Sequence, residues 1–301
     1  MKKEENMESY SEILNRAVNL IKSEGFAGAH SFVFLTRYAA LNDDKALMRL
    51  VGNSLEVLED MPVSPMLAYA YGEYYMAEGS EFCPPAADYI LNCCEESPML
   101  VMSLAKCASA FVREDYLERA MNMAAECALG ITGSNLSELA FSGLAYLELW
   151  RVTQNADYLN AAEKSAEYIR KNFRQLFKPE EAYDLEMPSG NSAAAVLYSS
   201  LACITQKDEW TEAESDQNRF VSMLADKYPT ACSFGLCALL PAEYGSNTVL
   251  CELPGEEYPK ELLSLLSFYA PTTEIIVTCF SNVEIPKYYL LKNGEKQEIS
   301  L

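Results

Sequence analysis

Hydrophobic positions recur at helical spacing through most of the chain. From Glu8 to about Leu240, successive segments of roughly 10 to 18 residues carry apolar positions three and four apart. Short turns separate these segments, and strand-like alternation is absent from this part. Asp43 is placed to cap the helix expected over residues 45–60. The pattern predicts a mainly α-helical protein.

The expected helices alternate in polarity. Residues 189–205, SGNSAAAVLYSSLACIT, carry no charge, whereas residues 208–228 are rich in acids. The first kind suits an inner helix packed on all sides, and the second suits an outer helix with one solvated face. A short turn with an aromatic residue recurs in REDYLERA, NADYLNAA and KDEWTEAE, which favours a repeat of about 45 to 50 residues. Six such hairpins predict an (α/α)6 toroid over residues 1–244, with a cavity where the inner helices begin.

The pattern changes after Tyr244. The segments NTVLCEL, PKELLSLLSFYA, TEIIVTCF and KYYLLKNGEKQEISL predict a strand, a helix, a strand and a strand in that order. We expect residues 245–301 to form a small α/β appendage that packs on the toroid.

Composition excludes several classes of partner. The 301 residues carry a formal net charge of -21, which repels phosphate backbones and anionic lipid, so we expect neither nucleic acid nor membrane as a partner. Neither a long apolar run nor a secretory signal is visible, which predicts a cytoplasmic protein. The ten cysteines are expected to be reduced. With His30 as the single histidine and no phosphate-binding motif, the sequence predicts no metal and no cofactor.

A polar corner, DLEMPSGNSAAA over residues 184–195, stands directly before a charge-free helix. Ser189 or Asn191 can accept hydrogen bonds from the unpaired amides of the first turn, and Gly190 permits a tight bend. The same amides and side chains suit hydroxyl-rich or anionic groups of a ligand. Both interpretations stay open, and the second makes Ser189, Gly190, Asn191 and Ser192 candidate ligand-binding residues.

The corner also carries a resemblance to a known family. Asp184 and the run Pro188–Ser192 match the D-x3-PSGNS signature of YyaL-type proteins, the thioredoxin-like family that includes the spermatogenesis-associated member of animals. The stretches NLSELAFSGLAYLELWRVTQNADYL and GFAGAHSFVFLTRYAALNDDKAL resemble two further segments of that family. The resemblance extends over nearly the whole chain. It implies a six-hairpin toroid, related in architecture to six-hairpin glycosidases and sugar 2-epimerases.

The sequence departs from that family at three places. It does not include the thioredoxin-like domain, so the resemblance implies no redox activity for this chain. Only residues 62–65 stand where the family has a long segment with a histidine, aromatics and carboxylates, and NGEKQEISL replaces the family's cysteine-bearing ending. The two histidines that the related epimerases use are not matched by His30 alone. These departures suggest a trimmed toroid.

Several acids are candidates for sugar chemistry, which uses carboxylates in pairs. Glu138 and Asp184 are the candidate catalytic residues, with Glu186 as a further acid near a helix start. Tyr71 and Glu73 lie in the aromatic segment AYAYGEYYM and are candidate ligand-binding residues. Each has an ordinary alternative, namely a solvated or capping acid or the packing of an inner helix.

Two functions follow from these candidates. The first is a protein that binds a polar, carbohydrate-like small molecule or a protein partner with reduced or no catalysis. The second is a carbohydrate-active enzyme, a glycoside hydrolase or sugar isomerase, that uses carboxylates at the toroid mouth. The trimmed mouth and the single histidine favour the first. Thiol redox chemistry is a third alternative, which the absence of a CxxC motif from the sequence disfavours.

Overall fold

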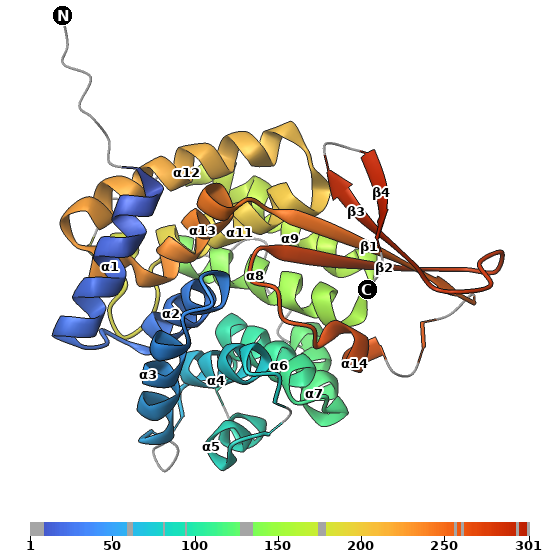
Figure 1. Cartoon of the computed structure of the whole chain (residues 1–301), viewed down its shortest axis with the longest axis horizontal. Coiled ribbons are helices and arrows are strands. Elements are labelled where there is room, and N and C mark those ends of the chain that lie inside the picture. The colour runs from blue at the N-terminus through green and yellow to red at the C-terminus, as the bar shows by residue number, and fades with distance from the viewer. Residues whose placement is uncertain are drawn as a thin grey trace, which may run out of the picture.

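The computed structural model describes residues 9–58, 63–80, 82–93, 95–126, 135–173, 179–255, 258–259, 262–292 and 295–299. Helices form most of the chain and strands form its end (Figure 1). The helices are α1 (Tyr10–Glu24), α2 (Ala29–Leu41), α3 (Lys45–Glu56), α4 (Pro65–Ala77), α5 (Pro85–Asp88), η1 (Tyr89–Asn92), α6 (Pro98–Ala110), α7 (Glu114–Glu126), α8 (Leu136–Thr153), α9 (Ala156–Asn172), α10 (Pro179–Ala182), α11 (Gly190–Thr205), α12 (Asp208–Lys227), η2 (Pro229–Cys232), α13 (Ser233–Tyr244) and α14 (Leu262–Leu266). The strands are β1 (Asn247–Pro254), β2 (Thr273–Phe280), β3 (Lys287–Lys292) and β4 (Glu295–Ile299). The mainly helical class that the sequence predicts is confirmed.

Polar residues start the helices, as the sequence pattern indicates. Ser64, Ser97 and Asn135 each accept a hydrogen bond from a backbone amide in the first turn of α4, α6 and α8, at 3.2, 3.2 and 2.8 Å. The expected cap at Asp43 is wrong by one position. Asp44 caps α3, because Asp43 has a φ of 49° and forms the preceding turn.

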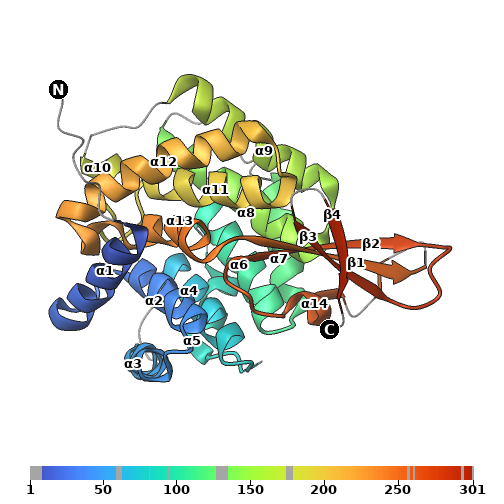
Figure 2. The same ribbon diagram turned by 45° about the horizontal axis from the view of Figure 1, so that its top comes forward.

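Within the described residues, six helices contact one another in a closed cycle. Helix α2 contacts α4, α4 contacts α6, α6 contacts α8, α8 contacts α11, α11 contacts α13, and α13 contacts α2 again. We call these the inner helices. Their side chains are largely buried, and α3, α7, α9, α12 and α1 pack outside them. In both views α1 and α3 lie at the edge of the molecule (Figures 1 and 2).

The C-terminal strands form one sheet in the order β2-β1-β3-β4. Strands β1 and β2 are parallel and are connected through α14, whereas β3 pairs antiparallel with β1 and with β4. The final segment, expected as a single strand, is this β3–β4 hairpin. We call the part of the chain after Tyr244 the tail. Helix α11 contacts β1 and β2, and α14 contacts α6 and α8, so the tail packs against the inner helices. Figure 2 shows the sheet on one side of the helical part.

The described ranges contain no helix that is both long and apolar enough to cross a bilayer. Eight cysteines lie in these ranges, and each has a free thiol. Cys94 and Cys127 lie outside the described residues.

Candidate functional site

A partly enclosed polar space lies where the inner helices end. Arg37 of α2, Glu73 of α4, Lys106 of α6 and both Glu148 and Arg151 of α8 line it. Side chains of α11 and α13 complete the wall, and Leu266 and residues 268–275 of the tail cover it. The space measures about 110 Å³, enough for several water molecules. We call it the charged cavity.

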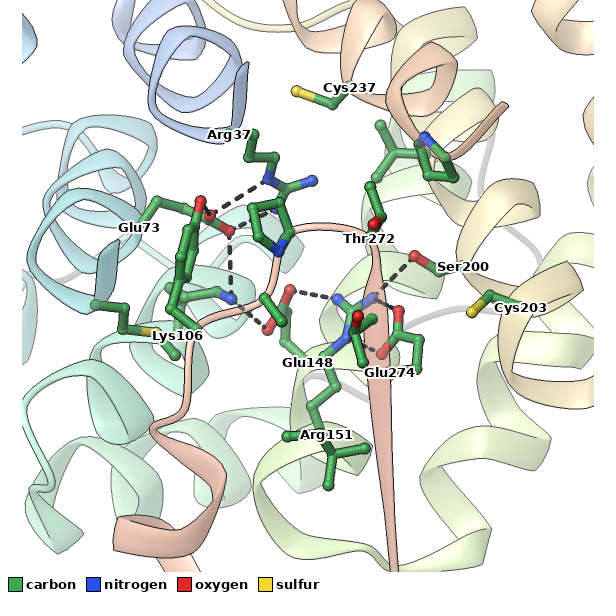
Figure 3. Close-up of a pocket in the computed structure, with 18 of the residues that line it drawn as sticks. Arg37, Glu73, Lys106, Glu148, Arg151, Ser200, Cys203, Cys237, Thr272 and Glu274 are labelled. Atoms are coloured by element: carbon green, nitrogen blue, oxygen red, sulfur yellow. Dashed lines mark hydrogen bonds and ion pairs between the residues drawn. The ribbon is translucent and has the colours of Figure 1, made fainter. Parts of the chain in front are cut away.

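Acidic and basic side chains alternate through this cavity (Figure 3). Arg37 binds Glu73 through two contacts, Nη2 to Oε1 at 2.5 Å and Nε to Oε2 at 3.3 Å. The Lys106 ammonium lies 3.3 Å from Glu73 Oε1 and 3.5 Å from Glu148 Oε2. Arg151 Nη1 then lies 2.6 Å from Glu148 Oε1. Lys106 therefore joins two buried carboxylates that come from different helices.

The tail supplies the last member of the alternating series. Glu274, in β2, accepts from Arg151 Nε at 2.9 Å and also from Nη2, so carboxylate and guanidinium meet edge to edge. Ser200 of α11 accepts from Arg151 Nη2 at 2.8 Å. Figure 3 shows Arg151 between Glu148 and Glu274. Elements far apart in the chain thus converge on one guanidinium.

Two tyrosine hydroxyls complete the carboxylate shells. Tyr69 donates to Glu148 Oε1 at 2.9 Å, and Tyr269 of the tail donates to Glu73 Oε2 at 3.0 Å. Burial and the adjacent carboxylates raise the pKa of both tyrosines well above the ordinary value. Both hydroxyls therefore stay protonated and act as donors.

Opposing effects act on the two buried glutamates. Burial alone raises the pKa of Glu73, but the positive charges of Arg37 and Lys106 outweigh it and hold that pKa well below its usual range. Burial also raises the pKa of Glu148, but the positive charges of Lys106 and Arg151 outweigh it, so that this pKa too is lowered. Both carboxylates are ionised at neutral pH.

Sequence reasoning found Glu73 but missed the other charged members of this cavity. The missed signal is an isolated charge in an otherwise uncharged helix: Arg37, Glu73 and Lys106 are the only Asp, Glu, Lys or Arg residues of α2, α4 and α6. An inner helix buries every face, so its one charged side chain needs a partner on a neighbouring helix.

Tyr71, the other candidate on α4, lies outside the charged cavity. Its hydroxyl donates to the Leu55 carbonyl of α3 at 2.9 Å, and its side chain is fully buried. It packs toward an outer helix.

The polar corner is buried and internally hydrogen-bonded. Asp184 Oδ1 accepts from the Ser189 amide and Oδ2 from the Phe234 amide, both at 2.8 Å, so one carboxylate joins the starts of α11 and α13. Ser189 Oγ accepts from the Ser192 amide at 3.1 Å as the cap of α11. Asp184, Ser189 and Ser192 are each at most 2% exposed. These contacts agree with the interpretation of the corner as a cap for the helix starts.

The remaining corner residues are packed just as closely. Asn191 Nδ2 donates to the Glu181 carbonyl at 2.6 Å, and its Oδ1 accepts from Gln217 at 3.1 Å. A Cβ added at Gly190 would lie 2.2 Å from Glu181 Oε2 and 2.7 Å from the Ser137 amide nitrogen. Gly190 is needed for this close approach.

Glu138 and Glu186 lie together at the other end of α6 and α8, where those helices begin. They line an open depression with apolar neighbours such as Phe141 and Met187, and both glutamates are exposed. The sequence predicts the site at this end of the helices. Asp184 lines neither this depression nor the charged cavity, so the candidate pair Glu138 and Asp184 does not share either space.

His30 is also buried at this end of the helices, and both of its ring nitrogens have hydrogen-bond partners. Its Nδ1 lies 2.5 Å from Ser233 Oγ and its Nε2 lies 2.7 Å from the Leu185 carbonyl, and the ring is fully buried. The histidine ties the loop before α11 to the start of α13. In the part of the chain that the structure describes, no three His, Cys, Asp or Glu side chains are grouped so that they could hold a metal ion.

The thiols nearest the charged cavity are poor nucleophiles. Burial raises the pKa of Cys237 to about 12 and that of Cys203 to about 11. Both thiols are therefore protonated at neutral pH, which disfavours a reactive thiolate at these two positions.

A solved structure shares this fold. The Lin0763 protein from Listeria innocua aligns with a TM-score of 0.56 over 78% of this chain and 99% of its own, with 11% identical residues. At that identity the likeness shows the fold alone. No family model and no curated protein matches the chain. The resemblance to YyaL-type proteins stays a prediction.

Proposed function

We propose that the protein binds a small polar, carbohydrate-like molecule in the charged cavity, with reduced or no catalysis. The observation that carries the proposal is the convergence of six alternately charged side chains on one partly enclosed space. Buried ion pairs stabilise a fold poorly, because desolvation offsets most of their attraction. Convergent polar groups with shifted pKa values in a cavity are instead typical of a binding site.

The cavity also has the chemistry that hydroxyl groups require. Glu73 and Glu148 can accept hydrogen bonds, Arg37 and Lys106 can donate them, and serine hydroxyls in the wall can do both. Apolar parts of Met76 and other lining side chains suit the carbon face of a sugar. A polyol matches this mixture better than an apolar ligand does.

We also propose that the helical part is a closed (α/α)6 toroid and that the chain is a distant, trimmed relative of the YyaL-type proteins. The closed cycle of contacts among the inner helices supports the toroid. The D-x3-PSGNS match supports the relationship. Residues 245–301 would be the appendage, which is supported by the contacts of β1 and β2 with α11 and of α14 with α6 and α8.

The geometry gives the enzymatic alternative less support. A glycoside hydrolase needs one carboxyl group that is protonated at the working pH. Glu73 and Glu148 both have lowered pKa values, so neither meets that need. Glu138 and Glu186 are exposed on an open depression, where water competes for every contact.

Calorimetric titration with a panel of neutral monosaccharides, sugar acids and polyols tests the proposed function. We expect at least one of these molecules to bind, and Ser200→Ala to weaken its affinity by about fivefold to tenfold because one cavity hydroxyl is lost. Ser54→Ala is the matched control, since Ser54 Oγ donates within α3 to the Leu50 carbonyl. Absence of binding across the panel, or equal effects of the two variants, would contradict the proposal.

A further inference from the structure

Two side chains of the tail reach into the charged cavity from the segment that covers it. We call residues 268–274, all of which line the charged cavity, the cover segment. The Tyr269 hydroxyl donates a hydrogen bond to Glu73 Oε2 at 3.0 Å, and the Glu274 carboxylate forms an ion pair with the Arg151 guanidinium. The tail thus contributes one hydroxyl donor and one carboxylate to a cavity made mainly by helices.

We infer that the Tyr269 hydroxyl and the Glu274 carboxylate occupy positions that a hydroxyl and a carboxylate of a bound ligand would take. The ligand would then be a small polyhydroxy carboxylate such as a sugar acid. The inference rests on the proposed function and narrows its ligand class. A polyhydroxy carboxylate carries in one molecule both groups that the cover segment now supplies. Exchange of the internal groups for the ligand's groups would leave Glu73 and Arg151 with equivalent partners.

The charge of the cavity points to an anionic ligand. Without Glu274, its charged side chains are three cations, Arg37, Lys106 and Arg151, and two anions, Glu73 and Glu148. One carboxylate therefore neutralises the opened site. The edge of Arg151 formed by Nε and Nη2 matches a carboxylate in two parallel hydrogen bonds, a geometry that a neutral sugar does not reproduce.

The tail also makes hydrogen bonds to the inner helices that do not involve Tyr269 or Glu274. Gln154, at the end of α8, accepts from the Val277 amide at 2.8 Å and donates to the Ile275 carbonyl at 3.3 Å. Thr248 of β1 donates to the Cys203 carbonyl of α11 at 2.9 Å. These bonds hold the sheet on the inner helices while the Glu274 side chain turns away.

Part of the cover segment lies outside regular secondary structure. Residues 268–271 lie outside helix and strand; Phe268 is 65% exposed and the other three are partly exposed. The space beneath measures about 110 Å³, below the roughly 300 Å³ at which ordinary small-molecule sites begin. A sugar-sized ligand would therefore need the cover segment to shift, and Tyr269 would leave Glu73 as it does so.

Glucuronate and glucose are the two probes, because they differ by one carboxylate. Calorimetric titration of the full chain compares wild type with Glu274→Gln. The matched control is Glu252→Gln, which removes a tail carboxylate that binds Lys296 at 2.9 Å on the sheet. We expect glucuronate to bind wild type more tightly than glucose does. We expect Glu274→Gln to strengthen glucuronate binding by about tenfold or more, because the competing internal carboxylate is gone, and Glu252→Gln to leave it unchanged.

A second variant and a second measurement cover the case in which Glu274→Gln folds poorly. Tyr269→Phe removes the internal hydroxyl, and we expect it to strengthen glucuronate binding as well. Hydrogen exchange of residues 268–270, which precede β2, should rise when glucuronate is added to wild type, whereas the β1–β2 pairing should stay protected. Unchanged exchange during measurable binding would overturn the inference.

The outcomes separate the two proposals. Equal binding of glucose and glucuronate, with no gain in Glu274→Gln, would overturn the sugar-acid inference and leave the proposed function intact. Failure of both probes to bind wild type and both variants would overturn the inference. A neutral sugar or polyol that binds in the wider panel would still support the proposed function in that case.

Discussion

The Lys106 ammonium lies between two buried carboxylates, 3.3 Å from that of Glu73 and 3.5 Å from that of Glu148. Lys106 is 8% exposed, and Glu73 and Glu148 are 1% and 2% exposed. A cation that neutralises two carboxylates from α4 and α8 holds the wall of the charged cavity together. The consequences for stability, pH dependence and activity can each be measured.

Removal of the Lys106 charge should destabilise the fold strongly. Lys106→Met leaves two buried carboxylates facing each other without their shared cation, and loss of one partner of a buried pair costs about 3–5 kcal/mol. Urea unfolding measures the change. Lys296→Met is the control, because the Lys296 side chain is 51% exposed and such surface pairs contribute at most about 1 kcal/mol. Similar losses in the two variants would show that Lys106 has no special role.

Stability should fall in acid because of the same carboxylates. The pKa values of Glu73 and Glu148 lie below the ordinary 4.5 in the folded protein, so the unfolded chain takes up these protons first. Their contribution is complete above about pH 5.5 and is lost as the pH falls through 4.5 toward the folded-state values. Urea unfolding from pH 7 to pH 3 tests this, with Glu73→Gln giving a shallower slope below pH 5. Parallel profiles for wild type and variant would refute this origin of the acid sensitivity.

Asp184 should matter for stability and not for binding. Asp184→Asn keeps one of the two acceptors that receive the Ser189 and Phe234 amides, so we expect a loss of about 1–3 kcal/mol of unfolding free energy. Asp157→Asn, in the exposed first turn of α9, should change stability by less than about 0.5 kcal/mol. Affinity for the best ligand of the panel should stay within about twofold of wild type. A variant with normal stability and lost binding would instead make the corner a binding site.

The protein should not hydrolyse glycosides. Assays with nitrophenyl glycosides between pH 5 and pH 8 should show no cleavage above the uncatalysed rate, because both glutamates of the cavity are ionised. Glu138→Gln and Glu186→Gln should then fold and bind as wild type does. Cleavage that is abolished by Glu138→Gln in a folded protein would support the enzymatic alternative at the depression.

The mainly helical class and the C-terminal strands could be predicted from the sequence because their signals are local. Apolar spacing predicts the helices, Ser64 and Ser97 stand where caps are needed, and alternation in the tail predicts the strands. Asp43 and Asp44 are both capping residues by type, and only the backbone at Asp43 decides between them. The division of the last segment into two strands is seen only in the antiparallel pairing of β3 with β4.

The candidate site could be predicted only in part, because its contacts join elements far apart in the chain. Glu73 was identified by its aromatic surroundings, whereas its partners Arg37 and Lys106 lie on other helices. Arg151 meets Glu274 across 123 positions, a separation that no local pattern encodes. The corner was recognisable by motif, yet its burial depends on packing against α13 and on the His30 contact with Leu185.

Hydrogen exchange of the wild-type protein with and without the best ligand of the panel tests the central claim most directly. We predict that binding protects the last turns of α4, α6 and α8, where Glu73, Lys106 and Arg151 line the charged cavity. Protection at residues 183–188 and at the start of α8, with the cavity unaffected, would place the ligand in the depression and contradict the account.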